Sequence, residues 1–135
     1  MFPLQHIIFS TIFCIILYPF IGNNVFIVWP ASIFIDIDHY LWYISYKKSW
    51  NLIKAIGEYM RRDFDNIRYK FHLFHLNELL IMVGLLGFYN IIFFYVFIGV
   101  LFHYILDWID MYSHPFERGG RTWSLIMYFK RKWST

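Results

Sequence analysis

The fold of this chain is decided by the apolar run IIFFYVFIGVLFHYILDWIDMY, residues 91–112. The run is long enough to cross a bilayer, because a helix needs about 20 mainly apolar residues to span the hydrocarbon core. His103, Asp107 and Asp110 interrupt it, and the first two are four positions apart. Residues at this spacing share one face of a helix, and ionisable groups inside membrane helices are rare and usually functional. The run therefore predicts a membrane helix that carries a functional site.

Three further apolar stretches of similar length precede it, at about residues 4–21, 25–46 and 71–88. The turn signal Gly22-Asn23-Asn24 separates the first two, and the short Tyr89-Asn90 connection joins the third to the fourth. Of the 135 residues, 59% are hydrophobic and only 16% are charged, which excludes an ordinary soluble domain. We predict one all-α domain over residues 1–135, an integral membrane four-helix bundle in which Pro30 kinks the second span.

Basic residues gather in two segments outside these spans, 47–70 and 113–135. In the first, apolar residues recur at helical spacing: Trp50, Ile53, Ile56 and Met60. This stripe predicts an amphipathic interfacial helix between spans two and three, and the tail is expected on the membrane surface as well. Because basic loops stay in the cytoplasm, both termini are predicted to be cytoplasmic in a multi-pass protein of the plasma (inner) membrane. Anionic membrane lipids, rather than nucleic acid, are the expected partners of these charges.

With this topology, carboxylate and imidazole side chains from all four spans lie at a similar depth, near the cytoplasmic end. They are His6 in the first span, Asp36, Asp38 and His39 in the second, His72, His75 and Glu78 in the third, and His103 and Asp107 in the fourth. This set of ligand types is typical of zinc sites. Carboxylates as close as Asp36 and Asp38 repel each other in a low dielectric unless a cation lies between them. We therefore expect a divalent metal, with zinc as the preferred ion.

The second span leaves two alternatives open. Asp36 and His39 share one face of a regular helix, whereas Asp38 points away from Asp36. Either one aspartate orients a ligand histidine without binding the metal, or the helix is irregular after Pro30.

The third and fourth spans are interpreted as regular helices. On the third, His75 shares a face with His72 and with Glu78, and carboxylate–histidine pairs at this spacing hold metals in helical bundles. On the fourth, the stripe of polar residues continues toward the surface through Asp110 and His114.

An early histidine, an Asp-x-Asp-His sequence, a histidine cluster and a His-x-x-x-Asp pair occur here in this order. The set resembles the small membrane-bound metal-dependent hydrolase family, which is similar to the zinc-dependent phospholipase C and single-strand nuclease superfamily. The resemblance covers about residues 1–112. It implies metal ligands at His6, Asp38, His75, His103 and Asp107, with Asp36, His39 and Glu78 as further candidates. The chain departs from the family pattern at Ile35, where the family often has proline, and in the segment 72–78, which lacks the family's Arg-Gly pair.

These residues predict metal-dependent hydrolysis of a phosphoester or phosphoanhydride of a lipid. The metal ligands would be His6, Asp38, His39, His75, His103 and Asp107. Asp36 or Glu78 would act as general base, and Arg118 and Arg121 would hold the substrate phosphate. Two other classes stay open: a transporter of metal ions or protons, and a non-catalytic membrane adaptor with a structural metal site. A saturated set of ligands would indicate a structural site, and an open position would indicate catalysis.

Overall fold

The computed structural model of the chain describes residues 3–61, 63–64, 67, 70–113 and 122–133. Its regular elements are helices, and no strand occurs among these residues. In chain order they are α1 (Pro3–Ile21), η1 (Gly22–Asn24), α2 (Val25–Phe34), α3 (Ile37–Lys47), α4 (Leu52–Met60), η2 (Leu73–His75), α5 (Asn77–Leu86), α6 (Ile91–Ser113) and α7 (Leu125–Trp133). The predicted all-α class is confirmed for this part of the chain.

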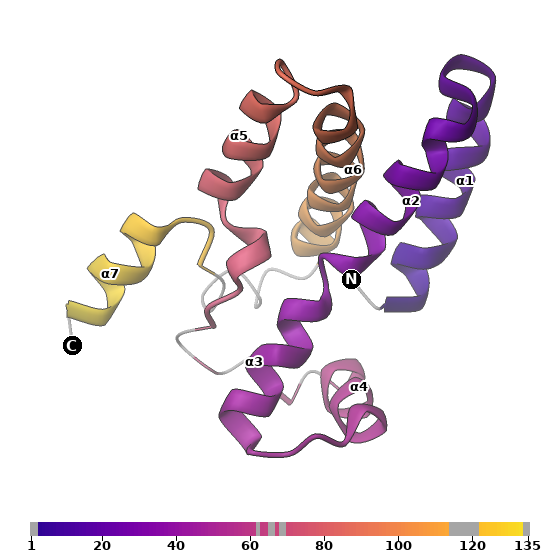
Figure 1. Cartoon of the computed structure of the whole chain (residues 1–135). Helices are drawn as coiled ribbons and strands as arrows, with labels where there is room; N and C mark the ends of the chain where they lie inside the picture. The colour runs from indigo at the N-terminus through magenta and orange to yellow at the C-terminus, as the bar shows by residue number, and fades with distance from the viewer. Residues whose placement is uncertain (1–2, 62, 65–66, 68–69, 114–121, 134–135) are drawn as a thin grey trace.

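Two helical hairpins form the apolar part of the molecule. The turn η1 joins α1 to α2, and the short turn before Ile91 joins α5 to α6, both at the same end of the molecule (Figure 1). Helix α2 packs against α6, with α1 beside α2 and α5 beside α6. The start of α1, the end of α2 and the second half of α6 therefore meet at the opposite end, which we call the polar end.

The close approach of α2 and α6 depends on Gly99. A Cβ atom at this position would clash with the carbonyl oxygen of Val28 and would lie 2.9 Å from Ala31 Cβ. Because glycine has no side chain, the two backbones can come within van der Waals contact one helical turn before His103. This contact fixes how far α6 stands from α2 at the polar end.

Two parts of the described chain are long and apolar enough to cross a membrane: Leu4–Lys47, formed by α1 to α3, and Ile91–Tyr112 in α6. In their most apolar windows only 17% and 33% of the residues are buried. The core helix of a soluble protein would be mostly buried, whereas a lipid-facing helix exposes its apolar side chains. These two stretches correspond to the first, second and fourth predicted spans.

The predicted second span is interrupted. Helix α2 ends at Phe34 and α3 begins at Ile37, so Ile35 and Asp36 form a turn between them. The backbone hydrogen bonds around this turn join residues three positions apart, as in a 3₁₀ turn. They run from Asp36 N–H to Ile33 O (3.3 Å) and from His39 N–H to Asp36 O (3.1 Å). The helix is therefore irregular after Pro30, as the second of the two alternatives for this span predicted.

The predicted third span, 71–88, is helical only in part. Helix α5 has ten residues, about 15 Å of helix, against the roughly 30 Å of a hydrocarbon core. His72 and Leu76 have extended backbone on either side of η2. The backbone donors that would continue the helix bind elsewhere instead, Phe74 N–H to Asp38 Oδ2 (2.8 Å) and Asn77 N–H to Trp123 O (2.8 Å). The expectation of a regular helix from residue 71 was wrong for this physical reason.

Helix α4 lies within the predicted interfacial segment 47–70. Asn51 Oδ1 caps it by accepting from Lys54 N–H at 2.9 Å. Its inner face buries Ala55 and Glu58, while the opposite face leaves Ile53 85% exposed. The predicted stripe of apolar residues is thus outward-facing. Helix α7, within the predicted tail segment 113–135, also exposes large apolar side chains.

Candidate metal centre

Eight imidazole and carboxylate side chains from α1, the α2–α3 turn, α3, the segment 72–75 and α6 meet at the polar end. They form four overlapping groups in which the ligand atoms lie within 4.8 Å of one another: His6, Asp36 and His103; Asp36, His39 and His75; Asp38, His39 and His72; and His75, His103 and Asp107. Most of them are almost fully buried. The side chains of Asp36 and His39 are the accessible ones, with 21% and 23% of their surface exposed. We call this set the His/Asp cluster.

His103 is oriented by the backbone of α2. Its Nδ1 lies 2.8 Å from the carbonyl oxygen of Ser32. A carbonyl oxygen can only accept, so Nδ1 carries the proton and, in the neutral ring, Nε2 presents a lone pair. One helical turn further along α6, Asp107 Oδ2 lies 3.3 Å from this Nε2. The predicted i, i+4 pair therefore converges on one point.

His75 is oriented by Asp38. Its Nδ1 lies 3.0 Å from Asp38 Oδ2, and the same oxygen accepts from Phe74 N–H at 2.8 Å. Because the carboxylate accepts, the proton of a neutral His75 is on Nδ1 and the lone pair on Nε2 faces His103. Asp38 thus fixes the ring of His75 from behind.

Four donor atoms converge between these residues. His75 Nε2 and His103 Nε2 lie 3.1 Å apart, and Asp107 Oδ2 lies 3.4 Å and 3.3 Å from them. Asp36 Oδ1 lies 3.6 Å from His75 Nε2 and 3.4 Å from His103 Nε2. The edges of a tetrahedron whose metal–ligand bonds are about 2.0–2.1 Å are about 3.3–3.4 Å long. The three donors of the His75, His103 and Asp107 group therefore fit a zinc-sized ion in both chemistry and spacing, and Asp36 lies beside the two histidines.

The same arrangement requires a positive charge, either a bound cation or a proton on one of the two histidines. Two imidazole lone pairs and two carboxylate oxygens face one another in a largely buried space. Such groups repel each other, and burial strengthens the repulsion because water does not screen it. A divalent ion among them would reverse the sign of the interaction.

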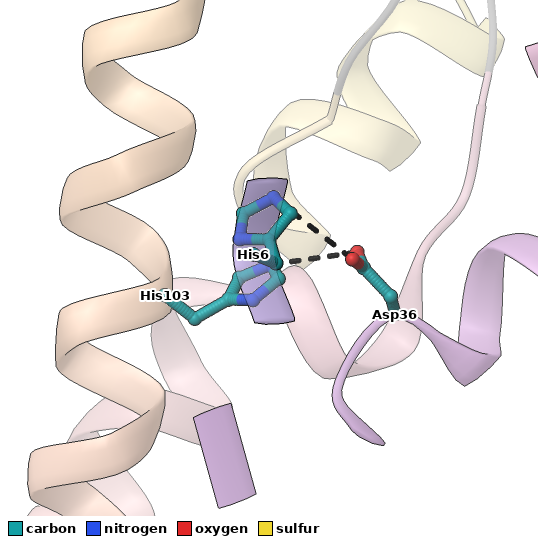
Figure 2. A group of neighbouring side chains, drawn as sticks. All are labelled: His6, Asp36 and His103. Carbon is teal, nitrogen blue, oxygen red and sulfur yellow. Dashed lines mark ion pairs between the residues drawn. The ribbon is translucent and has the colours of Figure 1, made fainter. Parts of the chain in front are cut away.

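His6 completes this side of the cluster. Its ring stacks on that of His103, with centroids 4.1 Å apart and planes at 13°. Figure 2 shows Asp36 directed at both rings; His6 Nε2 lies 3.9 Å from Asp36 Oδ2 and 3.2 Å from Asp107 Oδ1. His6 can therefore bind an ion together with Asp36 and His103, as the depth match of the sequence suggested.

The opposite side of the cluster is formed by Asp38, His39 and His72, which could also hold an ion. Asp38 Oδ1 lies 2.8 Å from His39 Nδ1 and 3.8 Å from His72 Nδ1, and the two rings are stacked 4.0 Å apart. Helix α4 supports this side, because Tyr59 donates its hydroxyl proton to the carbonyl oxygen of His39 at 2.9 Å.

The predicted metal ligands are all brought together: His6, Asp38, His39, His75, His103 and Asp107. Asp36, predicted as a general base, lies among them. His72 also joins, although it was outside the predicted ligands; its position in the histidine segment 72–75 was the available signal. No sequence pattern indicates the backbone partners of the cluster, the carbonyl of Ser32 and the N–H of Phe74.

Glu78, the other predicted general base, belongs to none of the four groups. Its Oε1 accepts from Leu125 N–H at 3.0 Å, at the start of α7. The prediction assumed one helix through His75 and Glu78, and the extended backbone of Leu76 breaks that register. Asp110 is described but lies outside the four groups. The predicted phosphate ligands Arg118 and Arg121, with His114, fall outside the described residues.

Comparisons of this chain with protein-family models, with curated proteins and with solved structures give no match.

Proposed function

We propose that this chain is a membrane-embedded, metal-dependent hydrolase that cleaves a phosphoester or phosphoanhydride of a lipid. The proposal places it as a multi-pass protein in the plasma (inner) membrane, with both termini and the His/Asp cluster on the cytoplasmic side. The preferred metal is zinc. Its substrates are lipid phosphates that present their headgroups at the interface.

One observation carries the proposal: three donor atoms of His75, His103 and Asp107 have the spacing that a zinc-sized ion requires, and Asp36 lies beside the two histidines. In a metal enzyme the ion must also be reachable by water and substrate. The partial exposure of Asp36 and His39 supplies such an opening, while the other side chains of the cluster shield the rest. This combination of buried ligands with one accessible edge supports a catalytic site.

The surroundings support a lipid substrate. The apolar faces of α1, α2 and α6 are exposed, and so is the apolar face of α4. Helix α4 lies next to α3, at the end of the molecule where the cluster lies (Figure 1). Basic residues are concentrated in the segments 47–70 and 113–135, which favours a cytoplasmic position beside anionic headgroups.

Hydrolysis needs an electrophile, a water molecule and a group that removes its proton. A bound divalent ion would polarise a phosphoryl oxygen and lower the pKa of a water molecule. Asp36 is the most exposed carboxylate of the cluster and is the candidate for removing that proton. Asp38 acts on the reaction indirectly, by holding the ring of His75.

A second function is favoured by the position of Asp36 beside the three donors. A zinc ion that also binds Asp36 would have four protein ligands and no open position. The cluster would then hold α6, the segment 72–75 and the α2–α3 turn together in a non-catalytic membrane adaptor. Whether Asp36 binds the ion or faces water decides between the two functions.

The test uses the purified, zinc-loaded protein and vesicles that contain phosphatidate, phosphatidylglycerol or a polyprenyl diphosphate, one lipid for each type of bond. We expect release of phosphate or of the phosphorylated headgroup from at least one of them, and its loss on chelation. Asp36→Asn should lower turnover about 10²- to 10⁴-fold while metal stays bound, since loss of a general base has this magnitude. Absence of turnover from all three lipids, with a cobalt-substituted protein whose visible spectrum shows saturated tetrahedral coordination, would favour the adaptor.

A further inference from the structure

A cavity of about 410 Å³ opens beside the His/Asp cluster, between α3, the segment 71–74 and α7. Its volume is in the range of small-molecule sites, about 300–1,000 Å³. The side chains that matter for its chemistry are Asp38, Leu41, Trp42, Ser45, Phe74 and Tyr128. We call it the α3–α7 cavity.

The cavity is connected to the cluster through Asp38. This carboxylate lines the cavity and also accepts from His75 and from Phe74 N–H. His39 Nδ1 lies 2.8 Å from its other oxygen. Asp38 is therefore the polar part of the lining through which the cavity adjoins the cluster. A molecule in the cavity therefore reaches the cluster with one end.

The rest of the lining is mostly aromatic and aliphatic. Phe71 and Tyr128 pack with ring centroids 4.8 Å apart and join the segment 71–74 to α7. Helix α7 is held there at its start, where Glu78 accepts from Leu125 N–H at 3.0 Å and Thr122 donates to Lys70 O at 2.7 Å. Such a lining binds hydrocarbon and excludes a small hydrophilic substrate.

The adjoining cluster favours an amphiphile with a phosphate headgroup. A divalent ion held by the cluster would attract a phosphate, while the largely apolar lining of the cavity accepts a hydrocarbon chain. An occupant with both parts matches the cavity and the cluster together.

We propose that the α3–α7 cavity holds the hydrocarbon chain of a lipid phosphate whose headgroup lies at the His/Asp cluster. This assignment rests on the proposed hydrolase function and adds the chain-binding site to it. Trp42, Ser45 and Tyr128 are then the residues that set the preference for chain length and shape.

The molecule offers a matched control surface. A second apolar cavity of about 550 Å³ lies between α5 and α6 and is lined by residues such as Leu80, Leu101 and Trp108. It contains no member of the His/Asp cluster. Lipid found there would represent ordinary contact with the bilayer.

The experiment is photolabelling of the full chain in lipid nanodiscs with hexadecyl phosphate that carries a diazirine at the end of its chain. Labelled residues are located by mass spectrometry. We expect labels on α3 and on the segment 71–74, and Ser45→Trp, which fills the cavity from an exposed position, should reduce them about tenfold. Leu101→Trp, which fills the control cavity, should leave them unchanged.

Labelling that is strongest on α5 and α6, or that Ser45→Trp does not reduce, would overturn the assignment of the cavity. This readout requires no turnover, so it is decided separately from the hydrolase proposal. If the protein hydrolyses lipids, Ser45→Trp should also raise KM for phosphatidate about tenfold, whereas Leu101→Trp should leave this KM unchanged.

Discussion

Helix α6 and the α2–α3 turn deliver ligands to the same cluster in different ways. Helix α6 is regular, and it contributes His103 and Asp107 because they are four residues apart on one face. At the α2–α3 turn the helix is broken, and Asp36 and Asp38, which would diverge on a regular helix, both reach the cluster. A regular helix can supply one ligand per turn, whereas a break lets neighbouring residues converge.

The comparison implies that α6 and the α2–α3 turn have different roles in metal binding. In the α6 pair, His103 is oriented by its bond to the carbonyl oxygen of Ser32, and both residues belong to the group with His75. The residues of the turn are partly exposed or are bonded to other ligands, as Asp38 is to His75. We therefore expect that changes in α6 abolish metal binding, while changes at the turn alter affinity or turnover.

The largest effect is expected for the double variant His103→Ala with Asp107→Ala. It removes two of the four converging donors, so the purified protein should lose its metal completely. Elemental analysis of the protein measures this loss. Asp110→Ala, on the same helix but outside the four groups, should keep the wild-type metal content. Full retention of metal in the double variant would show that α6 is not the centre of the site.

Periodicity identified the α6 pair, because both residues lie on a regular apolar helix whose register the sequence determines. It failed for Glu78, since the same reasoning extended a helix back to residue 71. Segment 71–76 contains no glycine or proline, so nothing local marks it as irregular. The cause is long-range: Asp38 accepts the backbone proton of Phe74, and a single sequence does not show which distant side chain will do so. The turn at Ile35–Asp36 was one of two open alternatives, and the order of the polar residues could not decide between them.

A smaller effect is expected for Asp38→Asn at the turn. If Asp38 only orients His75, zinc affinity should fall about 10- to 100-fold, as is usual for partners of metal ligands, while the metal content at saturating zinc is unchanged. Competition with a chelator measures the affinity. Asp63→Asn, in an exposed pair with Arg61, is the control and should have no effect. Loss of bound zinc at saturation would instead make Asp38 a direct ligand, as the family resemblance implies.

The variant Gly99→Ala tests whether the spacing of α2 and α6 couples the ligands of α6 to those near the α2–α3 turn. Gly99→Ala forces a Cβ against Val28 O and should destabilise the protein by about 1–3 kcal/mol, the usual cost of overpacking. By separating Ser32 from His103 it should also weaken zinc binding. Thermal unfolding in detergent and a zinc titration measure the two effects. In Gly57→Ala, inside α4, the new Cβ would make only an ordinary contact, 3.5 Å from Arg61, so zinc affinity should stay as in the wild type and stability should not fall. If zinc affinity were unchanged in Gly99→Ala, the spacing of α2 and α6 would not control the geometry of the site.

The smallest effect is expected for Glu78→Ala. Glu78 lies outside the cluster and accepts from Leu125 N–H, while Ser124 Oγ accepts from Met127 N–H at 3.1 Å in the same first turn of α7. Each residue therefore caps α7, and loss of a cap typically costs about 1 kcal/mol. Glu78→Ala and Ser124→Ala should lower the free energy of unfolding by similar amounts, with metal content and turnover unchanged. Denaturant unfolding and the vesicle assay measure both properties in parallel.

If only Glu78→Ala lost turnover while both variants kept their metal, Glu78 would be the general base that the sequence suggested. The first turn of α5 would then have to move to the cluster during the reaction. In that case the difference between α6 and the irregular segments would hold only for the site without substrate.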